Sequence, residues 1–223
     1  IKAYTGRNGT ISDSLVNYPA NGIPDYAFYN KIKHTYKSTL TSLMLPSSLF
    51  TIGKLAFYFN WNLAGTLTFP TSLKNIGDYA FYGCYNISSF SISTNNTRYS
   101  TNNGVLYNKS QDTLFLCPNA KTGSHVVLTS TKHIAGSAFE NCYKLTDISL
   151  PSGLQSTGSY AFSYCSELKS VIFPEISNKF NISRNSFTKC FSLEKIVIPK
   201  IFESMIYNIF YYVDLTKVNI TYI

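Results

Sequence analysis

IGDYAFYGCYN, residues 76–86, is a stretch that recurs along the chain. Residues 134–144 read IAGSAFENCYK, and residues 157–167 read TGSYAFSYCSE. The aromatic residue of the Ala-Phe pair, or of Ser-Phe in the last instance, falls at Phe28, Phe57, Phe81, Phe139, Phe162 and Phe187. The steps between these positions are 29, 24, 58, 23 and 25 residues. The chain therefore repeats with a period near 24 residues, and the longest step contains one period and an insertion of about 34 residues.

A second repeated block lies upstream of the aromatic residue. It reads LTSLMLP from Leu40, LAGTLTFP from Leu63 and LTDISLP from Leu145. The alternation of apolar and polar residues predicts a short strand with one buried face, which the proline ends because it cannot donate a ladder hydrogen bond. One such unit is too short to bury its own apolar face, so copies must stack and bury their Leu, Ile and Phe side chains in ladders. We therefore predict a β-rich solenoid of about six or seven coils with a parallel sheet.

Three small or aromatic residues recur in the I-G-x-x-A-F part of the unit. The glycine, as at Gly53 and Gly77, is predicted to supply a turn with positive φ. The alanine is predicted to leave room for the neighbouring coil, and the phenylalanine to fill the core.

Four cysteines lie three residues after the repeated phenylalanine, at Cys84, Cys142, Cys165 and Cys190. Equivalent positions on adjacent coils are ~4.8 Å apart with nearly parallel side chains, whereas a disulfide needs Cβ atoms ~3.8 Å apart. We therefore predict free, buried thiols that pack as small hydrophobic groups. Asn60 and Lys31 occupy the same position in earlier coils, which also argues against obligate bridging. Cys117 lies outside this ladder, and no Cys or His spacing fits a zinc site.

Charge and motif content argue against nucleic-acid binding and catalysis. The formal net charge is +8, but the basic residues are scattered and form no focused stripe. No stretch reaches the ~18 apolar residues of a membrane span. His34, His125 and His133 have no spacing to a nucleophile or metal partner, and no carboxylate pair suits general acid–base work. We therefore expect no enzyme activity, no cofactor and no bound metal.

The pattern L-x-x-I-x-L-P followed by I-G-x-x-A-F-x-x-C resembles the BspA-like, or Treponema-type, leucine-rich repeat family over roughly residues 23–199. NGVLYNKSQDTLFLCPNAKTG, residues 103–123, is similar to a hairpin that often interrupts arrays of this family. Its apolar runs, Val105–Tyr107 and Thr113–Cys117, flank a polar turn. The resemblance implies a β-rich α/β solenoid, a leucine-rich repeat stack with a parallel sheet on the concave face and short helical turns on the convex side.

The chain is predicted to form a single leucine-rich repeat domain, residues 1–223. Residues 1–22 are polar and irregular and would form an N-terminal cap. Residues 23–199 would hold the repeats, interrupted by the hairpin insertion at about 94–127.

The C-terminal segment departs from the repeat. The unit after Leu193 lacks the A-F-x-x-C block. Residues 200–213 have apolar residues at helical spacing and follow Pro199, which a helix start tolerates. We therefore predict a C-terminal cap over residues 200–223, with a helix that covers the last coil.

The family resemblance implies an extracellular adhesion module, on the cell surface or secreted, that binds host or microbial surface proteins. In each predicted strand the residues on either side of the middle apolar position should face outward on the concave side. These candidate binding positions are Ser42, Met44, Thr66, Thr68, Ser89, Ser91, Asp147, Ser149, Ser170, Ile172, Lys195 and Val197. An intracellular interaction scaffold stays open because no disulfide is required. A glycan-binding module that uses the tyrosines and the net positive charge stays open as well.

Overall fold

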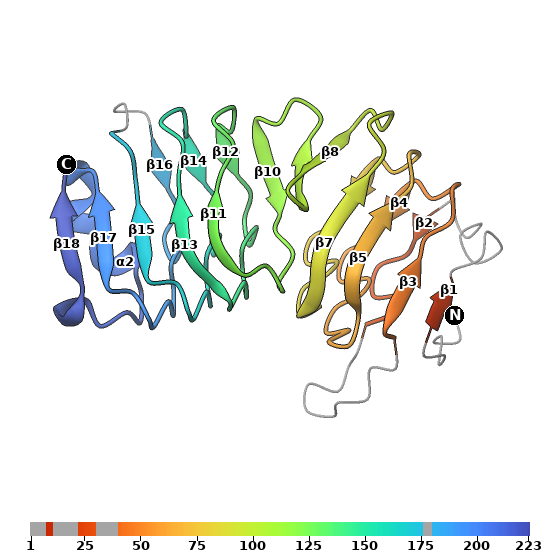
Figure 1. Ribbon diagram of the computed structural model, residues 1–223, viewed down its shortest axis with the longest axis horizontal. Coiled ribbons are helices and arrows are strands. Elements are labelled where there is room, and N and C mark those ends of the chain that lie inside the picture. Colours follow the sequence, from red (N-terminus) through yellow and green to blue (C-terminus); the bar gives the residue numbers. More distant parts are fainter. Residues whose placement is uncertain (1–7, 11–21, 30–39, 176–179) are drawn as a thin grey trace. The chain divides into compact units, whose positions relative to one another are not determined.

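The computed structural model describes residues 8–10, 22–29, 40–175 and 180–223 (Figure 1). The chain divides into two compact units, residues 1–109 (unit 1) and 110–223 (unit 2), each of which is described by itself. Most of the predicted N-terminal cap, residues 1–22, lies outside the described residues, as do Lys31 and His34. That the chain forms one continuous domain stays a prediction.

Unit 1 consists of coils that contribute longer and shorter strands. The longer strands are β1 (Asn8–Thr10), β3 (Ser42–Met44), β5 (Ala64–Phe69) and β7 (Asn86–Ile92). The shorter strands are β2 (Gly22–Ile23), β4 (Thr51–Ile52) and β6 (Asn75–Ile76). The pairs β1–β3, β5–β7, β2–β4 and β4–β6 are all parallel. The predicted parallel stacking of coils is therefore confirmed in this unit.

Unit 1 also contains an antiparallel hairpin of β8 (Tyr99–Asn102) and β9 (Val105–Asn108). The strands are joined by Asn103 and Gly104, whose φ angles of 47° and 76° fit the type I′ turn of two-residue hairpin loops. The Phe90 N–H donates to Gly104 O over 2.9 Å, so this turn lies against β7. The inserted segment was predicted to begin its pairing at Val105. The Asn-Gly pair, a strong hairpin signal, reveals that β8 comes before it.

Unit 2 has five longer strands in one parallel sheet (Figure 1). They are β11 (Gly123–Val126), β13 (Leu145–Ser149), β15 (Ser170–Ile172), β17 (Lys195–Ile198) and β18 (Asn219–Tyr222). A second set of strands, β10 (Thr113–Leu116), β12 (His133–Ile134), β14 (Ser156–Thr157) and β16 (Asn181–Ile182), also pairs in parallel. We group this set with the shorter strands because β12, β14 and β16 have two residues each, although β10 has four. The predicted solenoid of parallel leucine-rich repeat coils is thus confirmed.

The shorter strands stand where short helical turns were expected. Each is held extended because its backbone bonds to the preceding coil. The Gly158 N–H donates to Ile134 O over 2.8 Å, and the Ser156 N–H donates to Lys132 O over 3.1 Å. A helical turn would direct these N–H groups back into its own segment.

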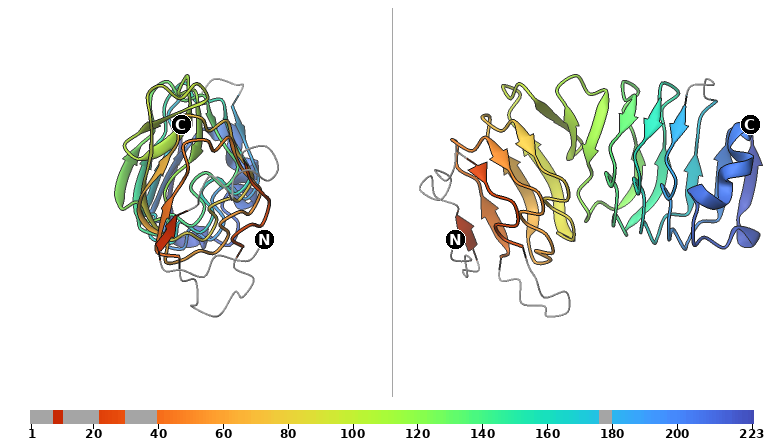
Figure 2. Two further views of the ribbon diagram at one scale, coloured as in Figure 1. Left: turned by 90° about the vertical axis from the view of Figure 1, so that its right-hand side faces the viewer. Right: turned by 180° about the vertical axis from the view of Figure 1, so that it is seen from behind.

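The C-terminal segment is helical for a shorter stretch than predicted. A 3₁₀ helix, η1 (Lys200–Met205), runs into the single turn of α2 (Ile206–Ile209), on the side of unit 2 that carries the shorter strands (Figure 2). A second 3₁₀ turn, η2 (Leu215–Lys217), precedes β18. Because β18 pairs in parallel with β17, the last residues extend the sheet, which the predicted cap did not include.

Stacked phenylalanines form the centre of each unit. In unit 1 the ring centroids are 5.0 Å apart for Phe28–Phe57 and 5.2 Å apart for Phe57–Phe81. In unit 2 the successive centroid distances are 4.8, 4.6 and 5.0 Å along Phe139, Phe162, Phe187 and Phe210. These distances match the spacing of about 4.8 Å between paired strands, because each coil supplies one ring. The predicted aromatic ladder is confirmed, and Phe210 continues it into the coil that lacks an A-F-x-x-C block.

Cys117 takes the ladder position in the first coil of unit 2. Its N–H donates to Ala138 O over 2.7 Å, as the Phe139 N–H donates to Ala161 O over 2.7 Å. Cys117 therefore stands where other coils place the phenylalanine, although no sequence motif marks it.

The cysteine thiols are free and buried, as predicted. The Cys84, Cys165 and Cys190 thiols each donate to the carbonyl of the ladder phenylalanine in the preceding coil, over 3.2, 3.1 and 3.2 Å. In an earlier coil the Asn60 amide makes the equivalent bond to Phe28 O over 2.8 Å. Burial raises the pKa of Cys84 and Cys190 to about 12, so these thiols stay protonated and unreactive.

Left-handed residues turn the chain between the shorter and the longer strand. Two residues before the ladder position they are Tyr26, Leu55, Tyr79, Ser137, Tyr160 and Asn185, and two residues after it they are Phe59, Gly83, Asn141, Tyr164, Lys189 and Tyr212. This conformation costs a residue other than glycine roughly 1–2 kcal/mol. It directs the N–H groups to the next coil, as Leu55 donates to Asp78 O over 3.0 Å, and these hydrogen bonds offset the cost.

The glycine of the I-G-x-x-A-F segment has a different role from the one predicted. Gly53, Gly77 and Gly158 do not have positive φ angles, so the predicted turn conformation is wrong. A Cβ atom at Gly77 would lie 2.4 Å from Lys54 N, and one at Gly158 would lie 2.3 Å from Gly136 N. Glycine is needed because the backbones of adjacent coils approach each other closely at this point.

We predict that Gly158→Ala destabilises unit 2 by about 1–3 kcal/mol, because the added methyl group forces two backbones apart. Gly136→Ala is the matched control, since its Cβ would meet nothing closer than Ser159 O at 3.3 Å. The decrease in the free energy of unfolding for Gly136→Ala should be less than about half of the decrease for Gly158→Ala. Urea denaturation followed by circular dichroism measures both values, and equal losses would contradict the close-approach role.

Phe81→Ala should lower the free energy of unfolding by about 3–5 kcal/mol, because neighbouring rings cannot fill the cavity. Phe81 is buried and stacks on Phe57, whereas Phe50 in the same unit is exposed. Phe50→Ala should therefore cost less than about 1 kcal/mol. A similar loss in both variants in chemical denaturation would show that the ladder does not carry the stability.

Candidate functional site

The longer strands of unit 2 present two outward-facing rows of side chains. The polar row consists of Ser124, Asp147, Ser170, Lys195 and Asn219, which lie opposite one another on consecutive strands. The aliphatic row consists of Val126, Ser149, Ile172, Val197 and Thr221. Between the rows, Ile148, Val171 and Ile196 are buried. The predicted outward positions of this unit therefore lie on one face of the sheet, and their role in binding stays a prediction.

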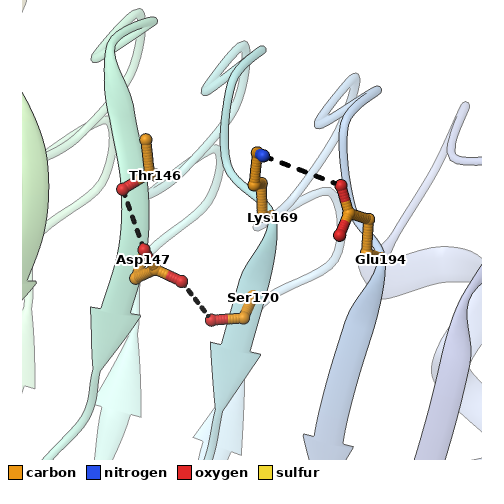
Figure 3. A network of polar contacts seen from close by, with 5 residues as sticks. All are labelled: Thr146, Asp147, Lys169, Ser170 and Glu194. Atoms are coloured by element: carbon orange, nitrogen blue, oxygen red, sulfur yellow. Dashed lines mark hydrogen bonds and ion pairs between the residues drawn. The ribbon is translucent and has the colours of Figure 1, made fainter.

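Asp147 links three strands of the polar row, and Figure 3 shows its hydrogen bonds to Thr146 and Ser170. Its carboxylate accepts hydrogen bonds from Ser170 over 2.6 Å, from Thr146 over 2.8 Å and from Ser124 over 3.2 Å. These bonds hold the pKa of the Asp147 carboxyl below its usual value, with the Ser170 bond contributing most. Asp147 is therefore negatively charged at neutral pH and has hydroxyl partners on both neighbouring strands.

The other charges beside the polar row are solvated. Lys169 Nζ lies 3.9 Å from the Glu194 carboxylate, and both side chains are mostly exposed (Figure 3). An exposed pair at this distance adds little stability. These charges can instead rearrange to meet a partner's surface.

The aliphatic row exposes apolar surface on a rigid sheet. Val126 is 69% exposed and Ile172 is 41% exposed. Val197 is half-buried, while Ser149 and Thr221 are exposed. β-Branched side chains have few rotamers, so a partner that covers them restricts little motion.

Ser124, Val126, Asn219 and Thr221 were missing from the predicted site. The structure adds them because β11 and β18 extend the sheet at its two ends. The alternation in GSHVVL, residues 123–128, and in VNITYI, residues 218–223, is the sequence signal for these strands.

The predicted positions of unit 1 differ in exposure. Ser42, Met44, Thr66 and Thr68 are exposed, and Met44 reaches 67%. Ser89 and Ser91 on β7 are half-buried and therefore less accessible to solvent. A Cβ at Gly104 would lie 2.6 Å from Ser89 Oγ, so the hairpin turn packs on Ser89 and limits its access to a partner.

Aromatic rings line the turns of unit 1 that follow the ladder phenylalanines. Tyr29, Tyr58 and Tyr82 each follow a ladder phenylalanine and stack with centroid distances of 4.9 and 5.1 Å. Trp61 contacts the Phe59 ring edge-on at 5.8 Å. This second aromatic ladder is not among the predicted binding positions. Its sequence signal is the tyrosine that directly follows the Ala-Phe pair in successive repeats.

His125 is the one histidine in the described residues that the fold buries. It takes the inward position that Ile148 has on the adjacent strand, and its ring lies 5.7 Å from that of Phe139. Its Nε2 has no hydrogen-bond partner among the residues that the structure describes. Burial, aided by Lys121, lowers the pKa of His125 to about 4, so the ring is neutral at physiological pH.

The exposed histidine of the described residues, His133, contacts one hydroxyl group. His133 lies on a shorter strand, where its Nδ1 is 2.8 Å from Ser156 Oγ. Three or more metal-ligating side chains do not gather anywhere within the described ranges. In the same ranges, every helix is too short or too polar to cross a bilayer.

Parallel coils with ladder residues and outward rows define a leucine-rich repeat solenoid. The chain belongs to the family described as BspA type leucine rich repeat region, which matches residues 21–123 and 117–222 with six copies. Repeats of this family are typically binding modules, and membership supports a protein-interaction role. The search of curated proteins finds no match.

Solved structures share the fold. A leucine-rich cell surface protein from Faecalibacterium prausnitzii is 23% identical with a TM-score of 0.66, covering 96% of this chain and 59% of that one. The pneumococcal vaccine antigen PcpA is 21% identical with a TM-score of 0.59, covering 79% and 53%. A leucine-rich repeat protein from Bacteroides ovatus is 18% identical with a TM-score of 0.51, covering 97% and 60%. The chain thus spans little more than half the length of these proteins.

We predict that the wild-type protein loses stability in mild acid through protonation of His125, and that the variant His125→Ile does not show this loss. The unfolded state takes up a proton near pH 6.5, while folded His125 does so only near pH 4. The wild-type free energy of unfolding should therefore fall by about 3 kcal/mol more than that of the variant as the pH drops from 7 to 4.

Denaturation midpoints at half-unit pH steps give this difference. Isoleucine is the residue at the equivalent position of β13 and β17, so the variant should fold well at pH 7.5. Parallel stability profiles of the two proteins would contradict a buried, neutral His125.

Proposed function

We propose that the chain is an extracellular adhesion module that binds host or microbial surface proteins through the longer-strand face of unit 2. The observation that carries this proposal is the aliphatic row, in which Val126 and Ile172 stay exposed on a parallel sheet. Family membership supports a protein-interaction module. The printed names of two similar structures, a cell surface protein and a vaccine antigen, support the cell surface as its place of action.

The two rows together have the composition of a protein interface. A non-obligate interface has an apolar centre with polar, solvent-accessible groups around it. The aliphatic row supplies the apolar part, and the polar row beside it supplies the hydroxyl groups, Lys195 and the charge of Asp147. A protein partner with an apolar ridge and both donors and acceptors beside it fits this surface.

The double variant Val126→Lys/Ile172→Glu tests the proposal without changing the net charge. Both side chains are exposed, so the melting temperature should shift by only a few degrees. Binding of the labelled protein to intact host or microbial cells should fall at least tenfold, because charged groups replace the apolar centre.

Tyr207→Glu is the control, since Tyr207 is exposed and belongs to α2, which lies on the shorter-strand side of unit 2 (Figure 2). It should leave cell binding within twofold of the parent. Full binding by a well-folded double variant would show that the aliphatic row is not the binding surface. Surface labelling of the intact source cells tests the compartment, and a protein that is protected from labelling would favour the intracellular scaffold.

A further inference from the structure

A cluster of tyrosines and one lysine lies in the left-handed turns of unit 2 that join the shorter to the longer strands. Tyr164, Lys189 and Tyr212 occupy the same position, two residues after the ladder phenylalanine, in three successive coils. Their backbones are left-handed, with φ angles of 60°, 60° and 61°. The Tyr164 N–H donates to Thr188 O over 2.9 Å and the Lys189 N–H donates to Tyr211 O over 3.0 Å, so the column is held by the coils themselves.

Lys189 lies between two aromatic rings. Its Nζ is 4.6 Å from the centroid of Tyr164 and 5.6 Å from that of Tyr212. Nζ also donates a hydrogen bond to Tyr164 Oη over 2.8 Å. The ammonium group is therefore oriented by its neighbours from both adjacent coils, which lowers the entropy lost when it binds a ligand.

Among the described residues, no carboxylate forms an ion pair with Lys189. Each ion pair in the described part of the chain joins other residues, Lys169 with Glu194 and Lys217 with Asp214. One ammonium proton goes to Tyr164, and the other two remain for an external acceptor. Since tyrosine hydroxyls are neutral, the cluster carries a net positive charge at physiological pH.

The rings beside Lys189 keep open surface. Tyr212 is 61% exposed and Tyr164 is 40% exposed, and the neighbouring Tyr211 is 48% exposed. The Tyr211 and Tyr212 rings lie 4.2 Å apart. The cluster thus offers aromatic surface, hydroxyl groups and one cation at fixed positions.

We propose that Tyr164, Lys189 and Tyr212 form a binding site for an anionic sugar unit, a sulfated or carboxylated pyranose of a cell-surface glycan. A pyranose presents one face of C–H groups that packs on an aromatic ring, while its hydroxyl groups bond to tyrosine hydroxyls. A sulfate or carboxylate on the ring accepts the free ammonium protons. This site goes beyond the proposed protein-binding face and uses different residues.

Three tetrasaccharides test the site by fluorescence polarisation with the purified chain. They are a heparin-derived tetrasaccharide, its desulfated and N-acetylated form, and that second form with its carboxyl groups reduced, which is neutral. Wild-type protein should bind at least one anionic form, and should bind the neutral form at least tenfold more weakly. The difference between the first two forms shows whether sulfate or carboxylate is the preferred anion. Raising the salt from 50 to 500 mM should weaken binding several-fold, because the charges lie at the surface.

Lys189→Met and Tyr212→Ala should each weaken binding of the preferred form at least fivefold. Lys144→Met is the matched control, because Lys144 Nζ also lies over a tyrosine ring, 5.4 Å from the centroid of Tyr143, but without a second ring. This control should stay within twofold of the parent, and so should Val126→Lys/Ile172→Glu, which separates this site from the protein-binding face. Melting temperatures show that each variant is folded.

The proposal is overturned if the neutral tetrasaccharide binds as well as the anionic forms, or if none binds at millimolar concentration. It is also overturned if Lys189→Met binds like the parent. An equal loss in Lys144→Met would show diffuse attraction to the basic surface in place of a site. Loss of cell binding in Lys189→Met without loss of tetrasaccharide binding would assign the cluster to a protein partner.

Discussion

Paired strands lie about 4.8 Å apart, and this distance governs every position in a coil. Because each coil hydrogen-bonds to the next, equivalent residues are held at that separation along the whole unit. Phenylalanine fits the spacing, since flat rings stack at 4.6 to 5.2 Å. Glycine is required where two backbones approach more closely, as at Gly158. Cysteines at equivalent positions remain thiols because parallel side chains at this distance do not bridge.

The same spacing organises the surface. Residues that face outward form rows on the sheet, and residues in the left-handed turns form columns along the turns between the shorter and the longer strands. The row through Val126, Ser149 and Ile172 alternates apolar side chains with a hydroxyl group along one line of the sheet. A column such as Tyr164, Lys189 and Tyr212 places a cation between two rings. A repeat solenoid can therefore change its ligand by changing exposed residues while the ladders keep the fold.

The two surfaces differ in physical character, which suits them to different ligands. The longer-strand face is broad, with apolar and hydroxyl side chains and one carboxylate that is bonded to its neighbours. The tyrosine and lysine cluster is small, positively charged and partly aromatic. An adhesion module with both could recognise a protein and the sugars attached to it through separate contacts.

The sequence by itself determined the coil period, the parallel sheet, the aromatic ladder, the free thiols and most of the outward positions. These follow from the spacing of residue types, because a residue at period 24 has the same environment in every coil. Only the tertiary structure decided features that depend on contacts between coils. The role of Gly77 was mistaken because the backbone of Lys54, 23 residues earlier, cannot be seen in a local pattern. Cys117 and Phe210 entered the ladder without a motif, β11 and β18 widened the sheet, and Lys189 gained its two tyrosines from adjacent coils. In each case the deciding contact joins residues more than 20 positions apart, and local sequence carries no direct record of it.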